Sequence, residues 1–263
     1  MDYLTYLLAG AIAGLLSGLF GVGGGLIIVP ILSLVFTGLA FPEQHVMHMA
    51  LGTSLATILF TSVSSARAHH SHANIIWSLV SKITPGIVLG ALLGTVLAAS
   101  LETGWLRMIF ALFVFAIATQ LILNLTPNPK RGLPGLFGTS VAGVIIGIIS
   151  SLVGIGGGSL SVPFLIYCNI SIKKSIGTSA AIGLPIALAG TAGFIFNGLH
   201  ATQLPSYSIG YIFIPAVFCI ASVSWIFAPL GAKLAQHLPA MTLKRAFAVL
   251  LYLIGLKMLW GLL

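Results

Sequence analysis

Residues 18–32 of the chain read GLFGVGGGLIIVPIL, and residues 151–165 repeat the same pattern as SLVGIGGGSLSVPFL. In each stretch, four of five consecutive positions are glycine, and a Val-Pro pair follows. Glycine costs a helix about 1 kcal/mol per residue relative to alanine, so we expect both stretches to interrupt a helix. The glycines concerned are Gly21, Gly23, Gly24 and Gly25 in the first stretch and Gly154, Gly156, Gly157 and Gly158 in the second.

Two further pairs of segments match in the same order along the chain. ALGTSLA at 50–56 resembles SIGTSAA at 175–181, and LRMIFALF at 106–113 resembles LKRAFAVL at 243–250. Three matches in one order indicate the duplication of a unit of about half the chain. We therefore predict two repeats, 1–128 and 129–263.

The composition places these repeats in a membrane. Hydrophobic residues make up 58% of the 263 positions and charged residues 5%, whereas a soluble domain averages about 45–50% and about 25%. This small number of charged residues cannot cover the surface of a soluble globule. The sequence therefore predicts an all-α, multi-pass membrane protein with the lipid bilayer as a partner. The net charge of +8 includes no basic run longer than two residues, so we do not expect nucleic-acid binding.

Ten apolar segments follow one another along the chain. Because a full span needs about 20 apolar residues, segment 159–170 is too short to cross and 26–40 is marginal. Each half then consists of a helix, a glycine break and a short return helix, followed by three transmembrane helices. The segments are 4–20, 26–40, 46–66, 77–100, 105–125, 133–153, 159–170, 176–197, 209–235 and 243–262.

The positions of the charges indicate how these segments cross. If each broken pair returns to the side where it began, nine of the 11 Lys and Arg residues lie on one face, and the three acids lie on the other. If each pair is one crossing, the split is five to six. The positive-inside rule favours the first arrangement. It predicts inverted repeats, a cytoplasmic basic face and both termini outside the cytoplasm.

The glycine breaks are the first candidate for a binding site. A helix that starts after a break presents unpaired N–H groups and a positive dipole end, and both favour an anion. The GTS motifs at 52–54 and 177–179 add hydroxyl donors without charge. We predict a central anion site between the two breaks, with hydroxyls from Thr53, Ser54, Thr178 and Ser179. Alternatively, these glycines serve only close helix packing, and the hydroxyls bond their own helices.

Other polar residues give weaker signals. Arg67 ends a stripe of Thr and Ser residues and is a candidate for receiving an anion, although a positive-inside role is the simpler reading. The HHSH run at 69–72 has no Cys or carboxylate near it in the sequence, so no metal site is expected. Cys168 and Cys219 form no ligand pattern, and no hydrolase, P-loop or cofactor motif is present. We therefore expect neither a cofactor nor enzymatic activity.

The doubled GxGGG…VP pattern, the GTS that follows each copy and PLGAKLA at 229–235 together resemble the TauE/SafE sulfite exporter family, also called TSUP. The resemblance covers nearly the whole chain. It implies an inner-membrane permease for small sulfur-containing anions, such as sulfite, thiosulfate or sulfonates. Ser159 and Ser161 stand where the first half has Leu26 and Ile28, an asymmetry that would bias which break holds the ligand.

The sequence therefore predicts a permease for a small sulfur-containing oxyanion, bound between the broken helices and exported or moved by facilitated diffusion. Two alternatives stay open: an anion channel of the same architecture, and a membrane scaffold or assembly factor without a substrate. The expected partners are the anion and the bilayer, and a homodimer is one assembly that the sequence allows.

Overall fold

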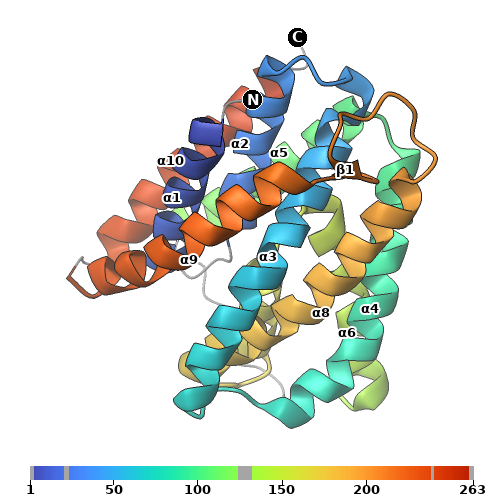
Figure 1. Ribbon diagram of the computed structural model, residues 1–263. Coiled ribbons are helices and arrows are strands. Elements are labelled where there is room, and N and C mark those ends of the chain that lie inside the picture. Colours follow the sequence, from blue (N-terminus) through green and yellow to red (C-terminus); the bar gives the residue numbers. More distant parts are fainter. Residues whose placement is uncertain (1–2, 21–23, 124–131, 238–239, 261–263) are drawn as a thin grey trace.

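The computed structural model describes residues 3–20, 24–123, 132–237 and 240–260 (Figure 1). Within these ranges the chain forms ten α-helices, a short 3-10 helix and one two-stranded hairpin. The first half holds α1 (Tyr3–Phe20), α2 (Gly25–Gly38), η1 (Glu43–His45), α3 (Val46–Ser71), α4 (Trp77–Ser100) and α5 (Thr103–Ile122). The second half holds α6 (Leu136–Val153), α7 (Gly158–Tyr167), α8 (Ile172–Gly198), β1 (Ser208–Ile209), β2 (Ile212–Phe213), α9 (Ile214–His237) and α10 (Ala240–Trp260).

The predicted all-α membrane fold is confirmed. Each of the ten apolar segments contains one helix, and six helices of the described part are long and apolar enough to cross a membrane. They are α3 with η1, α4, α5, α6, α8 and the first 18 residues of α9. The return helices α2 and α7 are shorter, with 14 and 10 residues.

One segment differs from the prediction. The apolar segment 209–235 begins as a helix only at Ile214, because Ser208 pairs with Phe213 and Ile209 with Ile212 in an antiparallel hairpin. Gly210 turns this hairpin with a φ of 55°, a conformation that most other residues avoid. Hydropathy alone did not separate these apolar strand residues from the helix that follows.

Equivalent helices of the two halves make equivalent contacts with the opposite half. The first helix of each half lies along the fourth helix of the other, as α1 does with α9 and α6 with α4. In addition, α3 packs against α8, and α5 against α10. Two equivalent halves would produce this pairing. The repeat boundary falls in 124–131, outside the described residues, so the two repeats and their inverted orientation remain predictions.

Glycines allow α6 to approach α4 closely, and α1 to approach α9 in the same way. A Cβ atom on Gly147 of α6 would lie 2.5 Å from the Ile87 oxygen and 2.7 Å from the Ala91 nitrogen of α4. At the equivalent contact, a Cβ on Gly14 of α1 would lie 2.7 Å from the Ser224 Cα of α9. Small residues allow such close approach between membrane helices, where packing rather than water exclusion drives association.

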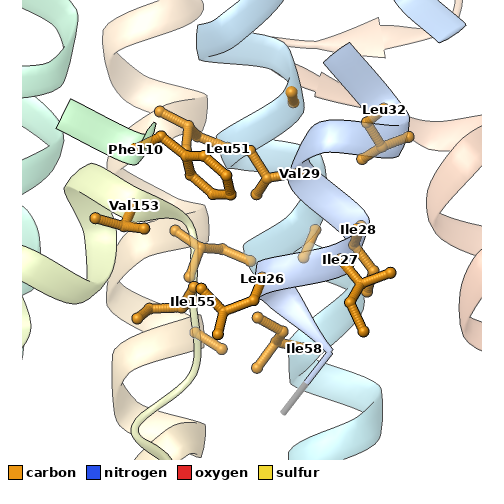
Figure 2. Packing of buried hydrophobic residues seen from close by; sticks show 14 of the residues in the cluster. Leu26, Ile27, Ile28, Val29, Leu32, Leu51, Ile58, Phe110, Val153 and Ile155 are labelled. Carbon is orange, nitrogen blue, oxygen red and sulfur yellow. The ribbon is translucent and has the colours of Figure 1, made fainter. Parts of the chain in front are cut away.

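An apolar cluster fills the space between the broken helices. Figure 2 shows Leu26 and Val29 of α2, Leu51 of α3 and Ile155 after α6 gathered at this point. All four side chains are at most 1% exposed. The start of α2, directly after the first break, is therefore buried among apolar side chains.

The close α4–α6 contact gives a stability prediction. Gly147→Ala should lower the free energy of unfolding by about 1–3 kcal/mol, because the added methyl group overlaps the α4 backbone. Gly38→Ala is the matched control, since no atom lies within 4 Å of the added carbon. The thermal midpoint in detergent would be measured for both variants; equal midpoints would show that α4 and α6 are not packed this closely.

Candidate functional site

The described end of the first glycine break packs against the second break. A Cβ atom on Gly25 would lie 2.6 Å from the Gly154 oxygen, and one on Gly154 would lie 2.9 Å from the side chains of Leu51 and Val29. Gly24 and Gly154 also have positive φ values of 70° and 68°, which other residues rarely adopt. Both breaks therefore require glycine at these positions. Gly21 and Gly23 lie outside the described residues.

Ser54 links the first half to the second break. Its hydroxyl is buried and donates a hydrogen bond of 2.8 Å to the Gly154 carbonyl oxygen. The bond satisfies an acceptor that the interrupted helix leaves without its usual partner. Ser54 thus has a structural partner in this arrangement, and anion binding by its hydroxyl stays a prediction.

The two threonines of the GTS motifs hold equivalent loops. The Phe213 N–H donates to the Thr53 hydroxyl oxygen at 3.0 Å, and the Ile76 N–H donates to the Thr178 hydroxyl oxygen at 3.1 Å. Phe213 directly precedes α9 and Ile76 directly precedes α4. Each threonine therefore anchors the loop of the opposite half.

The glycines of the GTS motifs make room for the same two loops. A Cβ on Gly52 would lie 3.0 Å from the Tyr211 oxygen, and one on Gly177 would lie 2.9 Å from the Asn74 Cβ. Thr53 and Thr178 do not line either of the two cavities described below. The structure gives both hydroxyls a partner within the protein, and their predicted role as anion ligands stays a prediction.

A cavity of about 110 Å³ opens at the second break, between α3, α7 and α8. A single water molecule needs about 10–15 Å³ of comparable cavity volume, so this cavity can hold a small solute. Four of the residues predicted for the site line it, namely Gly156, Gly157, Gly158 and Ser179. The structure therefore brings together the second glycine cluster and the serine of the second GTS motif.

The N-terminus of α7 forms one wall of this cavity. Gly157 is the N-cap, and the helix begins with the bond from the Ser161 N–H to the Gly157 oxygen. The first N–H groups of a helix have no acceptor within it, and its dipole places partial positive charge there. This end of the cavity can therefore stabilise a negative charge without a cationic side chain.

Ser179 of α8 lines the same cavity. Its side chain is 2% exposed, and its hydroxyl has no hydrogen-bond partner in the described structure. By contrast, the hydroxyls of Thr61 and Ser62 across the cavity donate to carbonyl oxygens of their own helix. A buried hydroxyl without a partner costs about 1–3 kcal/mol, and an oxygen atom of a bound ligand would satisfy it.

The serines that distinguish the second break from the first are buried beside it. Ser159 lines none of the described cavities, nor does Ser161, yet both hydroxyls lack a hydrogen-bond partner in the described ranges. Leu26 and Ile28, at the matching positions of the first half, belong to the apolar core. The described cavity thus lies at the more polar of the two breaks.

Sequence reasoning did not identify Gly183, which faces Gly157 across the cavity. A Cβ atom there would lie 3.6 Å from the Ser62 Cβ and 3.8 Å from the Gly157 nitrogen. Gly183 follows Ser179 by four positions on α8, so the two lie on the same helical face. That spacing was visible in the sequence, although nothing there showed which face of the helix meets the break.

A second cavity, of about 600 Å³, lies at the other end of α3. Its lining includes Glu43, His48, Glu102, Arg107 and Tyr211, and none of the residues predicted for the site. Residues 49–57 of α3, between the two cavities, are all buried. Burial raises the pKa of Tyr211 above its usual value.

The remaining polar candidates lie outside the glycine breaks. Arg67 lines neither cavity, whereas His69 lines the smaller one. His70 accepts a hydrogen bond from the Trp77 indole N–H at 3.1 Å. Among the described residues, no three His, Cys, Asp or Glu side chains form a group that could hold a metal ion.

Comparison with known proteins identifies similar sequences along almost the whole chain. A family model described as "Sulfite exporter TauE/SafE" matches residues 6–258. A "Probable membrane transporter protein" of Haemophilus influenzae is 40% identical over 257 residues, which cover 97% of each chain. A protein of the same description from Methanocaldococcus jannaschii is 29% identical over 261 residues, or 96% of this chain and 94% of the relative. No solved structure matches the chain.

The loop anchors at the GTS motifs give a second prediction. Thr178→Val should lower the free energy of unfolding by about 1–3 kcal/mol, because the Ile76 N–H loses its acceptor. Thr178→Ser keeps the hydroxyl and is the matched control. Thermal midpoints of both variants in detergent would be compared, and a Val variant as stable as the Ser variant would contradict the anchoring role.

Proposed function

Because the chain belongs to the sulfite exporter TauE/SafE family, we propose that it carries a small sulfur-containing oxyanion, of the sulfite, thiosulfate or sulfonate type, through the cavity at α7. The chain is a multi-pass membrane transporter of this family, similar over nearly its full length to proteins described as probable membrane transporters. The proposed substrate class follows from the family description, and the proposed binding site follows from the position of the cavity.

One observation carries the assignment of the site. The N-terminus of α7 and Ser179 line the same small cavity, and the buried Ser179 hydroxyl has no hydrogen-bond partner in the described structure. Backbone N–H groups and a hydroxyl can replace part of the water shell of an oxyanion at membrane depth. Irregular backbone is tolerated at that depth only where it is buried or lines a cavity, and the second glycine break meets this requirement.

The proposed orientation follows from the charges. The cavity opens between the C-terminal half of α3 and the start of α8, where His69 and Ile176 line it. Arg67, Lys173 and Lys174 do not line it, but they lie within three positions of these two residues along the chain. We assign this end to the cytoplasm of a cell with the chain in its inner membrane, with two inverted repeats and both termini outside. A membrane potential with a negative interior favours outward movement of a monovalent anion by about 2.3 kcal/mol per 100 mV. Export would then need no coupling carboxylate.

The two cavities favour a carrier over an open channel. The smaller cavity and the one at Glu43 and Glu102 are separated by the buried stretch 49–57 of α3. A channel in its conducting state would need a continuous path between them. A scaffold without a substrate would not need a buried cavity with an unpartnered donor, so this alternative is weaker.

A substitution that fills the cavity tests the site. Gly183→Leu should abolish anion binding and flux, since the new side chain projects toward the Gly157 nitrogen without a close clash at its Cβ. Gly38→Leu is the matched control, because that position is open. Both variants should insert into the membrane and purify as the wild type does.

The assay is uptake of radiolabelled methanesulfonate, a monovalent sulfonate, into liposomes that contain the purified full chain. We expect saturable flux for the wild type and for Gly38→Leu, and none above protein-free liposomes for Gly183→Leu. Normal flux in a well-folded Gly183→Leu variant would show that the anion takes another route. Flux that never saturates would favour the channel.

A further inference from the structure

The cavity at α7 offers dipoles to an anion but no cationic side chain. Among the described residues that line it there is no Lys, Arg, Asp or Glu, and His69 is its one titratable side chain. The residues that line it include the first residues of α7, with their free N–H groups, and Ser179, whose buried hydroxyl is unpartnered in the described structure. The positive potential there comes from the helix end, which corresponds to about half an elementary charge.

The charge of the ligand decides whether such a site can hold it. The cost of removing an ion from water rises with the square of its charge, so a dianion costs roughly four times as much as a monoanion of the same size. Attraction to fixed dipoles rises only in proportion to the charge, so it roughly doubles. Without a cation to offset the difference, a dianion gains too little in this cavity to leave water.

We infer that this site selects singly charged oxyanions over dianions of the same shape. The inference rests on the proposed function and adds the charge class of its substrate. Sulfonates meet the requirement at every physiological pH, whereas thiosulfate is a dianion there, so the inference narrows the proposed substrates to sulfonates and hydrogen sulfite. Sulfite would be carried as hydrogen sulfite, HSO₃⁻, so each anion that crosses would take one proton with it.

Three tetrahedral sulfur compounds separate charge from shape. Dimethyl sulfone, methanesulfonate and sulfate differ by exchange of methyl groups for oxygen atoms and carry charges of 0, −1 and −2. None of them titrates near neutral pH. Their affinities for the purified full chain in detergent would be measured by isothermal titration calorimetry at about pH 8, where an unperturbed imidazole is mostly neutral.

We expect methanesulfonate to bind at least tenfold more tightly than either sulfate or the sulfone. Ser179→Ala should weaken methanesulfonate binding. Ser222→Ala, at an exposed serine on α9 whose hydroxyl bonds its own helix, should leave it unchanged. Sulfate binding as tight as methanesulfonate, and weakened by Ser179→Ala, would overturn the charge selectivity and leave the site in place. If the wild type binds none of the three compounds, or if Ser179→Ala does not change methanesulfonate binding, both the proposed site and its charge selectivity are overturned.

A charge-adding variant gives an independent readout. Ser65 is half-buried and lines the cavity, so Ser65→Lys places a cation beside the anion. We expect the ratio of sulfate to methanesulfonate affinity to rise at least tenfold. Ser81→Lys adds the same charge at an exposed position of α4 outside the cavity and should leave the ratio unchanged. An unchanged ratio in a folded Ser65→Lys variant would contradict the inference.

Discussion

The structure depends on the contact between the two helix breaks. Breaking a helix at membrane depth exposes backbone N–H and C=O groups that lipid cannot satisfy. Here the start of α2 packs on the end of α6, with Gly25 against Gly154, and Ser54 donates to the Gly154 oxygen. Apolar side chains from α2, α3 and the second break seal this contact (Figure 2). At the start of α7, by contrast, the backbone faces a cavity, so its N–H groups remain available to a ligand.

The three residues of each GTS motif have different structural roles. Gly52 and Thr53, like Gly177 and Thr178, receive a loop of the opposite half and hold its backbone. The serines that follow have different surroundings. Ser54 donates to the second break, whereas Ser179 lines the cavity and its buried hydroxyl is unpartnered in the described structure. The first two positions thus support the packing of the halves. The third position differs, since Ser179 lines the described cavity and Ser54 does not.

Much of the fold could be predicted because hydropathy and glycine spacing act locally. The ten apolar segments and the breaks at Gly24 and Gly154 follow from them. The partners of Thr53 could not be predicted, because the loop that it anchors lies 160 positions away. Nor could the role of Gly183, since the face of α8 that meets the break is set by packing against α3 and α7. The hairpin at 208–213 was missed because its strands are as apolar as the helix after it.

The position of a bound anion tests the account most directly. A crystal of the full chain grown with methaneseleninate, a singly charged selenium oxyanion, would reveal the ion by the anomalous scattering of selenium. The account predicts a peak in the cavity at the start of α7, within hydrogen-bond reach of the Gly157–Gly158 backbone and the Ser179 hydroxyl. A peak in the cavity at Glu43 and Glu102 instead, or none at a saturating concentration, would contradict it.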